Sequence, residues 1–215
     1  MSEENIEIPA SPEQVWAAIT TDSGAWSFQV DIDGDTARFH REPFAPDATA
    51  TVTAWEPPHR FAYEDPTFAT EILVTARDQG SCVVRVVSSL RVEGEGWDDI
   101  AEQASKGWAM TLQVLRCYTT HFAGMPSARI DLIRPVDRHA DIAGNLPVDG
   151  VIEHRGPAFT LLRTTDPCPG MFAISCFSMD AATLSVNVTG RLYGPDAEAS
   201  VATERSRWHD WLTRI

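Results

Sequence analysis

The sequence has 215 residues, of which 43% are hydrophobic and 22% charged, the proportions of a globular protein rather than of a disordered or repetitive chain. Its 31 acidic and 17 basic residues give a formal net charge of −14, and a surface with that charge repels phosphate backbones and anionic lipid headgroups. No apolar stretch approaches 18 residues and the N-terminus is acidic. We therefore expect a cytoplasmic protein of one large or two small domains that binds no nucleic acid and inserts into no membrane.

The first part of the chain predicts a strand, a helix and then a run of strands. Residues 5–8 alternate as a short strand, and Ser11 and Pro12 are residue types that begin a helix. Trp26 and Phe28 then indicate a second short helix or a turn. Five strands are expected at residues 36–41, 49–55, 60–63, 70–77 and 82–92. Their connections are too short for helical crossovers, so the strands should form an antiparallel meander.

The strongest helical pattern follows Gly96. Apolar residues recur there at steps of three and four for about six turns, and Gly124 and Pro126 end the pattern. The order of elements predicts an α+β fold in which this long helix lies across a curved antiparallel sheet.

The second half of the chain resembles the first at a shift of one hundred positions. Val86 matches Val186, and Trp108 and Leu112 match Trp208 and Leu212. The first strand matches residues 130–132 at a shift of 124, so the second copy lacks about 24 residues after its first strand. We predict a domain at 1–124 and a shortened second domain at 127–215, the alternative being two unrelated strand-rich stretches.

Three segments carry a resemblance to a known fold. They are residues 6–16, the stretch WEPPHRFAY at 55–63, and Gly107-Trp108 followed by Leu112 and Leu115. Together they resemble the helix-grip superfamily (birch-pollen-allergen-like, START-like or SRPBCC proteins), and within it the bacterial group named for its similarity to the activator of Hsp90 ATPase. The resemblance implies a seven-stranded curved sheet that grips a long helix around an apolar cavity. It also implies a function among lipid binders, hormone binders, polyketide cyclases and aromatases.

An enzyme of this fold needs a polar group inside its cavity to move a proton or orient an oxygen atom. The candidates are His59, Tyr63, Glu71, Arg85, Arg91 and His121. Each also has a structural interpretation: His59 follows two prolines in a turn, and an ion pair on the outer face of the sheet is the default for Arg85. No two of them are predicted to converge.

Metal and cofactor signals are absent from the sequence pattern. The four cysteines have no C-x-x-C spacing, and we interpret them as buried small apolar residues. His139 and Asp141, or His209 and Asp210, lack the spacing and the third ligand of a metal site, and no phosphate-binding glycine motif occurs. We expect no metal and no cofactor.

Large aromatic residues concentrate in the first copy, and they predict a ligand pocket there. Its walls should be the strand residues Trp55, Phe61 and Tyr63 and the helix residues Trp108, Leu112 and Leu115. Its lid should be Trp26 and Phe28. The predicted function is binding of a hydrophobic or aromatic small molecule between sheet and helix. The alternatives are a polyketide cyclase or aromatase and a co-chaperone-like interaction module, with a homodimer or protein partner left open.

Overall fold

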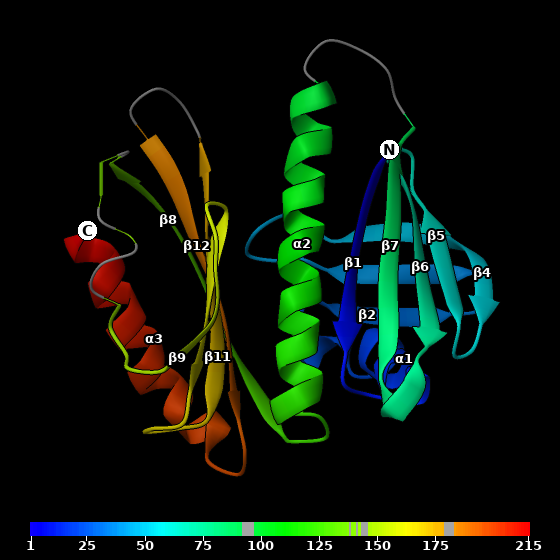
Figure 1. Ribbon diagram of the computed structural model, residues 1–215. Helices are drawn as coiled ribbons and strands as arrows, with labels where there is room; N and C mark the ends of the chain where they lie inside the picture. Colours follow the sequence, from blue (N-terminus) through cyan, green and yellow to red (C-terminus); the bar gives the residue numbers. More distant parts are fainter. Residues whose placement is uncertain (92–96, 138, 141, 143–145, 179–182) are drawn as a thin grey trace. The chain divides into compact units, whose positions relative to one another are not determined.

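The computed structural model describes residues 1–91, 97–137, 139–140, 142, 146–178 and 183–215, with the side chains of 97–103 left out. The chain divides into two compact units, Met1–Ala123 and Gly124–Ile215. Each contains one antiparallel sheet whose last strand leads to a helix (Figure 1). This is the α+β helix-grip class that the sequence predicts.

Unit 1 contains seven strands, two α-helices and two short 3-10 turns. The strands are β1 (Ser2–Ile8), β2 (Gln29–Asp33), β3 (Thr36–His40), β4 (Ala48–Glu56), β5 (Arg60–Glu64), β6 (Phe68–Ala76) and β7 (Cys82–Leu90). The helices are α1 (Pro12–Thr20) and α2 (Trp97–His121), and the turns are η1 (Ser23–Ala25) and η2 (Asp78–Gly80). The sheet order is β1-β7-β6-β5-β4-β3-β2, so β2 is an edge strand.

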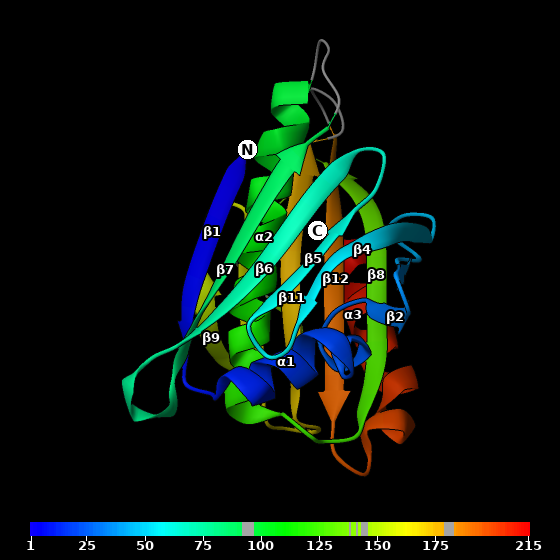
Figure 2. The same ribbon diagram turned by 90° about the vertical axis from the view of Figure 1, so that its right-hand side faces the viewer.

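Helix α1 begins as its sequence predicts. The Ser11 hydroxyl accepts a hydrogen bond from the Gln14 backbone N–H at 3.3 Å, and the Gln14 side chain accepts one from the Ser11 N–H at 2.9 Å. This reciprocal pair satisfies two N–H groups that have no partner within the helix. Figure 2 shows α1 crossing one end of the sheet, where it packs against β6 and β2.

The core of unit 1 lies between the sheet and α2, which packs against β1 and β7. Leu112 and Leu115 of α2 are 3% and 1% exposed, and Ile8 and Val84 of the two strands are fully buried. The long helix therefore occupies the β1–β7 side of the sheet and not the β2–β4 side.

Unit 2 repeats this plan with fewer elements. Its strands are β8 (Ser127–Asp137), β9 (Val151–Arg155), β10 (Phe159–Thr164), β11 (Gly170–Ser178) and β12 (Thr183–Tyr193), followed by α3 (Ala197–Arg214). Trp208 and Trp211 of α3 are buried against the sheet, and the Trp208 ring lies 4.6 Å from that of Phe172.

The two sheet orders correspond strand by strand. Unit 2 has the order β8-β12-β11-β10-β9, which is the order of unit 1 after β3 and β2 are removed. Only 13 residues (138–150) separate β8 from β9, whereas 39 residues (9–47) separate β1 from β4. The shortened second copy therefore has no counterpart of β2 and β3 among the described residues.

The shift of one hundred positions does not hold for every strand pair. Ile72 lies opposite Val86, so a constant shift would place Phe172 opposite Val186, but Phe172 lies opposite Gly190. The difference of four residues is even. Strands β11 and β12 therefore keep the faces of β6 and β7, because side chains alternate with a period of two. Strand β10 does not, since Leu162 lies opposite Phe172 where the shift would place Leu161.

Strand β2 is absent from the expected elements, which place only a short helix or turn before residue 36. The structure adds Gln29–Asp33, paired with β3 across a turn at Gly34 whose φ is +58°.

In the described residues, no helix has the length and apolarity needed to cross a membrane.

Candidate functional site

Five aromatic rings form a continuous run on one face of the unit 1 sheet. Trp16 of α1 meets Trp55 of β4 at 5.0 Å between ring centroids, and Trp55 meets Phe61 of β5 at 5.6 Å. Phe61 then contacts Tyr63 at 5.4 Å, and Tyr63 contacts Phe39 of β3 at 4.9 Å. The run forms because residues opposite each other in an antiparallel pair share a face, as Trp55 and Phe61 do.

A groove of about 650 Å³ opens at the Trp16–Trp55 end of this run. Its lining comes from α1 and the residue after it, from β2 and its turn, and from β4: Trp16, Thr20, Thr21, Gln29, Val30, Asp31, Ile32, Gly34 and Trp55. Trp55 remains 46% exposed although its neighbour Phe61 is only 2% exposed. The groove thus presents an accessible indole surface next to a rigid core.

The edge strand β2 is fixed beside the groove by a turn residue. The Val30 backbone N–H donates a hydrogen bond of 2.9 Å to the Ser23 hydroxyl, and Ser23 is buried. Val30 and Ile32 alternate with Gln29 and Asp31, so the side chains of Val30 and Ile32 share the face of Phe39, and those of Gln29 and Asp31 lie on the opposite face of this edge strand.

Three hydroxyl groups lie across β5, β6 and β7 beside the aromatic run. Thr70 lies opposite Tyr63 on one side and opposite Ser88 on the other. The Thr70 and Ser88 hydroxyl oxygens are 3.5 Å apart, and both residues are buried. Burial raises the pKa of Tyr63 to about 12, against a smaller lowering by its hydrogen bond with Thr70. The Tyr63 phenol, protonated at neutral pH as a tyrosine ordinarily is, can donate a hydrogen bond, and its raised pKa makes it a poorer source of phenolate.

The eight residues of the predicted pocket occupy several environments. Trp55, Phe61 and Tyr63 belong to the aromatic run, and of the eight only Trp55 lines the groove. Leu112 and Leu115 are buried in the core beneath α2.

The other three predicted pocket residues lie outside the run. Trp26 is 5% exposed and its indole N–H donates to the Ala18 carbonyl oxygen at 2.8 Å, so it anchors α1 as a core residue. Phe28 contacts Phe44 at 6.1 Å, and Trp108 is half-buried on α2. A cavity between the sheet and the long helix stays a prediction.

The polar candidates other than Tyr63 serve structural roles. Arg85 pairs with Glu3 at 2.6 Å between half-exposed side chains, which confirms the expected outer-face ion pair. Glu71 pairs with Arg60 at 2.7 Å, and a ring nitrogen of His59 lies 3.2 Å from the Val74 carbonyl oxygen.

Arg91 and His121 complete these candidates. Arg91 pairs with Glu64 at 3.1 Å, and His121 is exposed at the end of α2. Neither lines the groove.

Sequence reasoning did not place Trp16 and β2 in a site. The alternation of Val30 and Ile32, followed by Asp33-Gly34, is the pattern of a strand leading into a hairpin turn and could have revealed β2. The approach of α1 to that strand depends on contacts between distant segments, which no local pattern encodes.

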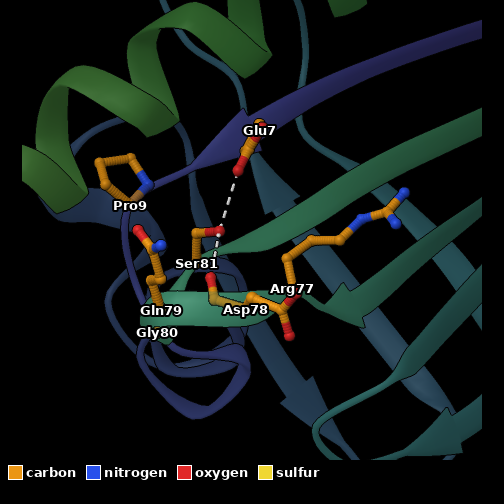
Figure 3. A pocket seen from close by; sticks show the side chains of 7 residues that line it. All are labelled: Glu7, Pro9, Arg77, Asp78, Gln79, Gly80 and Ser81. Carbon is orange, nitrogen blue, oxygen red and sulfur yellow. Dashed lines mark hydrogen bonds between the residues drawn. The ribbon is translucent and has the colours of Figure 1, made fainter.

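A second pocket of about 490 Å³ lies where β1 ends beside the turn between β6 and β7 (Figure 3). Its lining is Glu7, Pro9, Arg77, Asp78, Gln79, Gly80 and Ser81. The Ser81 hydroxyl is 2.9 Å from a Glu7 carboxylate oxygen, and Figure 3 shows the Arg77 guanidinium directed away from both. With one proline as its apolar side chain, this pocket offers little surface to an apolar ligand.

Among the described residues, no three His, Cys, Asp or Glu side chains gather as metal ligands.

One family model matches the chain. It is the model described as polyketide cyclase / dehydrase and lipid transport, and it matches residues 2–113, which is most of unit 1. The sequence has no significant match among proteins with curated descriptions.

Solved structures are similar to one or both units. A conserved protein of unknown function from Enterococcus faecalis has 19% identity, with 54% of this chain and 68% of that chain covered and a TM-score of 0.46. The Aha1 dimer from Colwellia psychrerythraea has 19% identity, with 57% and 97% covered and a TM-score of 0.46. The di-domain ARO/CYC BexL from the BE-7585A biosynthetic pathway has 13% identity, with 98% and 96% covered and a TM-score of 0.51. This last likeness extends over both units and fits a duplicated helix-grip fold.

Proposed function

Because the chain belongs to the polyketide cyclase / dehydrase and lipid transport family, we propose that unit 1 binds a flat hydrophobic or aromatic small molecule in the groove between α1, β2 and Trp55. The observation that carries this proposal is the exposed indole of Trp55, held edge to face against Trp16 at the wall of a groove of about 650 Å³. Ligand sites are typically concave, largely apolar surfaces with a few polar groups.

Burial of the ligand's own apolar surface can drive binding to the groove without a catalytic group. A flat ligand that loses about 200 Å² of apolar surface gains roughly 5 kcal/mol before ordering costs. Trp16, Trp55, Val30 and Ile32 are the apolar residues of the lining, and Thr20, Thr21, Gln29 and Asp31 are its polar residues. Weak to micromolar binding is the expected range.

A fluorescence titration tests this proposal. The neutral planar probe N-phenyl-1-naphthylamine should bind the wild-type protein with a rise in probe emission, and Trp55→Ala should weaken its binding about tenfold or more. Leu112→Trp is the matched control, since it enlarges a core side chain on α2 and changes no residue of the groove. If Leu112→Trp abolishes binding in a protein that circular dichroism shows to be folded, the ligand lies between sheet and helix instead, and the groove assignment is wrong.

A cyclase or aromatase activity is the second candidate, and the hydroxyl row of Tyr63, Thr70 and Ser88 favours it. A protonated phenol next to two buried hydroxyl groups is suited to hold a ketone or enol oxygen. Tyr63→Phe removes that donor and keeps the ring contacts with Phe39 and Phe61.

The same variant separates the two candidates. A binding module should bind the probe with unchanged affinity after Tyr63→Phe, whereas an enzyme should lose turnover of a linear poly-β-ketone substrate. If wild-type protein releases no cyclised product from such a substrate, the enzymatic candidate fails.

A further inference from the structure

We propose that the outer edge of β2 binds an extended peptide segment in which apolar and basic residues alternate, as an added strand of the unit 1 sheet. Strand β2 ends the sheet order and pairs with β3 alone, so among the described residues one side of its backbone has no neighbouring strand. An edge of this kind accepts a further strand through main-chain hydrogen bonds. The proposal goes beyond the binding of a small molecule, because it rests on the backbone of β2 and not on the indoles, and its test is independent of that function.

The hairpin turn fixes which backbone groups of β2 point outward. Asp33 lies opposite Thr36 across a two-residue turn whose first residue, Gly34, has a φ of +58°. The residues that flank such a turn bond to each other, and bonded pairs then alternate along an antiparallel hairpin. Val30 and Ile32 are therefore the residues of β2 that direct their N–H and C=O groups away from β3.

The hydrogen bond of Val30 agrees with this direction and marks where the open edge begins. The Val30 N–H donates to Ser23 Oγ at 2.9 Å, and Ser23 belongs to η1 and not to the sheet. The next outward groups are those of Ile32, for which the described part of the chain provides no such partner. The edge is thus open from Ile32 toward the turn. An antiparallel strand there can accept a hydrogen bond from the Ile32 N–H and donate one to its C=O.

The side chains of β2 present a different chemistry on each face. Val30 and Ile32 are half-buried, line the groove and share the face of Phe39. Asp31 and Asp33 are exposed on the opposite face. Residues directly opposite each other in neighbouring strands share a face, so alternate residues of the partner lie beside apolar groups and beside carboxylates. A segment that alternates apolar and basic residues fits both faces.

The carboxylates also disfavour other strands. A second copy of β2 would place Asp31 and Asp33 beside the same carboxylates of the other copy, and like charges directly opposite each other destabilise a strand pair. Arg38 and His40, the basic residues of the hairpin, are on β3, one strand further from the edge. His40 is shared by Asp31 and Asp47, at 2.8 and 3.0 Å. An approaching strand therefore meets two carboxylates first, in a protein whose formal net charge is −14.

A titration of the ¹⁵N-labelled full-length protein with the peptide acetyl-Lys-Val-Lys-Val-Lys-amide tests the proposal at neutral pH and low salt. The Ile32 amide proton should move downfield because it gains a hydrogen bond, whereas that of Asp31 is already bonded within the hairpin and should move less. The acidic peptide with glutamate in place of each lysine should bind about fivefold more weakly or less tightly still. Equal binding of the two peptides overturns the proposal. So does an Ile32 signal that moves with protein concentration in the absence of peptide, since it would assign the edge to a second copy.

N-methylated peptides test the strand pairing itself. A valine opposite Ile32 points its N–H at the edge, so methylation of both valine backbone nitrogens should weaken binding about tenfold or more. Methylation of the last two lysine backbone nitrogens is the matched control, since those N–H groups point away from β2 and their loss should change the affinity by less than about threefold. Equal losses from the two changes overturn the pairing.

Two variants of the protein test the edge from the other side. Ile32→Pro removes an N–H that the β2–β3 pair does not use, and it should weaken peptide binding about tenfold or more, followed through the Gly34 amide signal. Asp33→Asn should weaken binding about two- to fivefold. Asp78→Asn is its matched control, because it makes the same change in charge at the exposed turn between β6 and β7 and should leave the affinity unchanged.

Circular dichroism establishes that each variant is folded. Unchanged affinity in folded Ile32→Pro, or equal effects of Asp33→Asn and Asp78→Asn, overturns the proposal. If Ile32→Pro does not fold, the methylated peptides and Asp33→Asn decide the matter in the same way.

Discussion

The indole rings of Trp16 and Trp55 meet edge to face, with centroids 5.0 Å apart and an angle of 71° between their planes. One ring comes from the first helix and the other from the fourth strand, so this contact joins α1 to the sheet at the mouth of the groove. Aromatic pairs in this geometry are worth about 0.5–1.5 kcal/mol beyond the area they bury. The contact therefore holds α1 in the position that makes the groove.

Trp55 and Phe61 should differ in how much they stabilise the fold. Trp55 is 46% exposed, so Trp55→Ala should cost about 1 kcal/mol, mostly from lost ring contacts. Phe61 is 2% exposed, and Phe61→Ala should cost about 3–5 kcal/mol because it leaves a cavity. Urea unfolding of both variants measures the difference. Equal costs would mean that Trp55 is a core residue and not a ligand surface.

Trp26→Phe should destabilise unit 1 although it keeps an aromatic ring. It removes the 2.8 Å hydrogen bond to the Ala18 carbonyl and part of a buried side chain, at a cost of about 1–3 kcal/mol. Trp108→Phe at a half-buried position is the comparison and should cost less. Thermal unfolding followed by circular dichroism gives both values, and the reverse order would contradict the anchoring role of Trp26.

Replacing Gly190 or Gly107 with alanine should change the stability of the protein in opposite directions. A Cβ at Gly190 would lie 2.7 Å from the Phe172 ring, which itself packs on Trp208, so Gly190→Ala should cost about 1–3 kcal/mol. Gly107 lies within α2 with open space around it, and Gly107→Ala should stabilise the protein by up to about 1 kcal/mol. Unfolding midpoints that shift in the same direction would show that one of these packing assignments is wrong.

The stability of unit 1 should fall as the pH rises through the titration of His40. Its hydrogen bond with Asp31, and then that with Asp47, raise the pKa of His40 above its ordinary value of 6.5. Protonated His40 therefore contributes its full stabilisation below about pH 6.5, the pKa of an unfolded-state histidine. This contribution is lost as the pH rises through the higher pKa of His40 in the folded protein. His40→Asn removes the contribution. The difference in urea midpoint between wild type and His40→Asn should therefore shrink from about pH 5.5 to about pH 8.5, and a difference that grows over this range would contradict the prediction.

Much of the fold of unit 1 could be predicted because its signals are local. Ser11 and Pro12 identify the start of α1, and the strands at residues 36–92 follow from alternation between turn residues. Strand β2 is missed because Trp26 and Phe28 favour a helix or turn there, and the alternation of Val30 and Ile32 before the Asp33-Gly34 turn is not counted as a strand. That omission matters, since β2 supplies four of the groove residues.

The candidate site could be predicted only in part, for a related reason. Aromatic composition directed attention to Trp55, Phe61 and Tyr63, which do share a face. The direction of a side chain in a turn does not follow from periodicity, so Trp26 could not be recognised as a core residue bonded to Ala18. The side of the sheet that α2 covers depends on the pairing of β1 with β7, which joins the two ends of the unit.

The most direct test of the proposed function uses the indole N–H signals of the seven tryptophans in a ¹⁵N-labelled protein. Each signal is assigned by a single Trp→Phe substitution, and 1-naphthalenemethanol is then added in steps. We expect the Trp16 and Trp55 signals to move together with one binding curve while those of Trp26, Trp208 and Trp211 stay in place. Movement of the Trp108 signal without movement of Trp16 and Trp55, or no movement at ligand saturation, would contradict it.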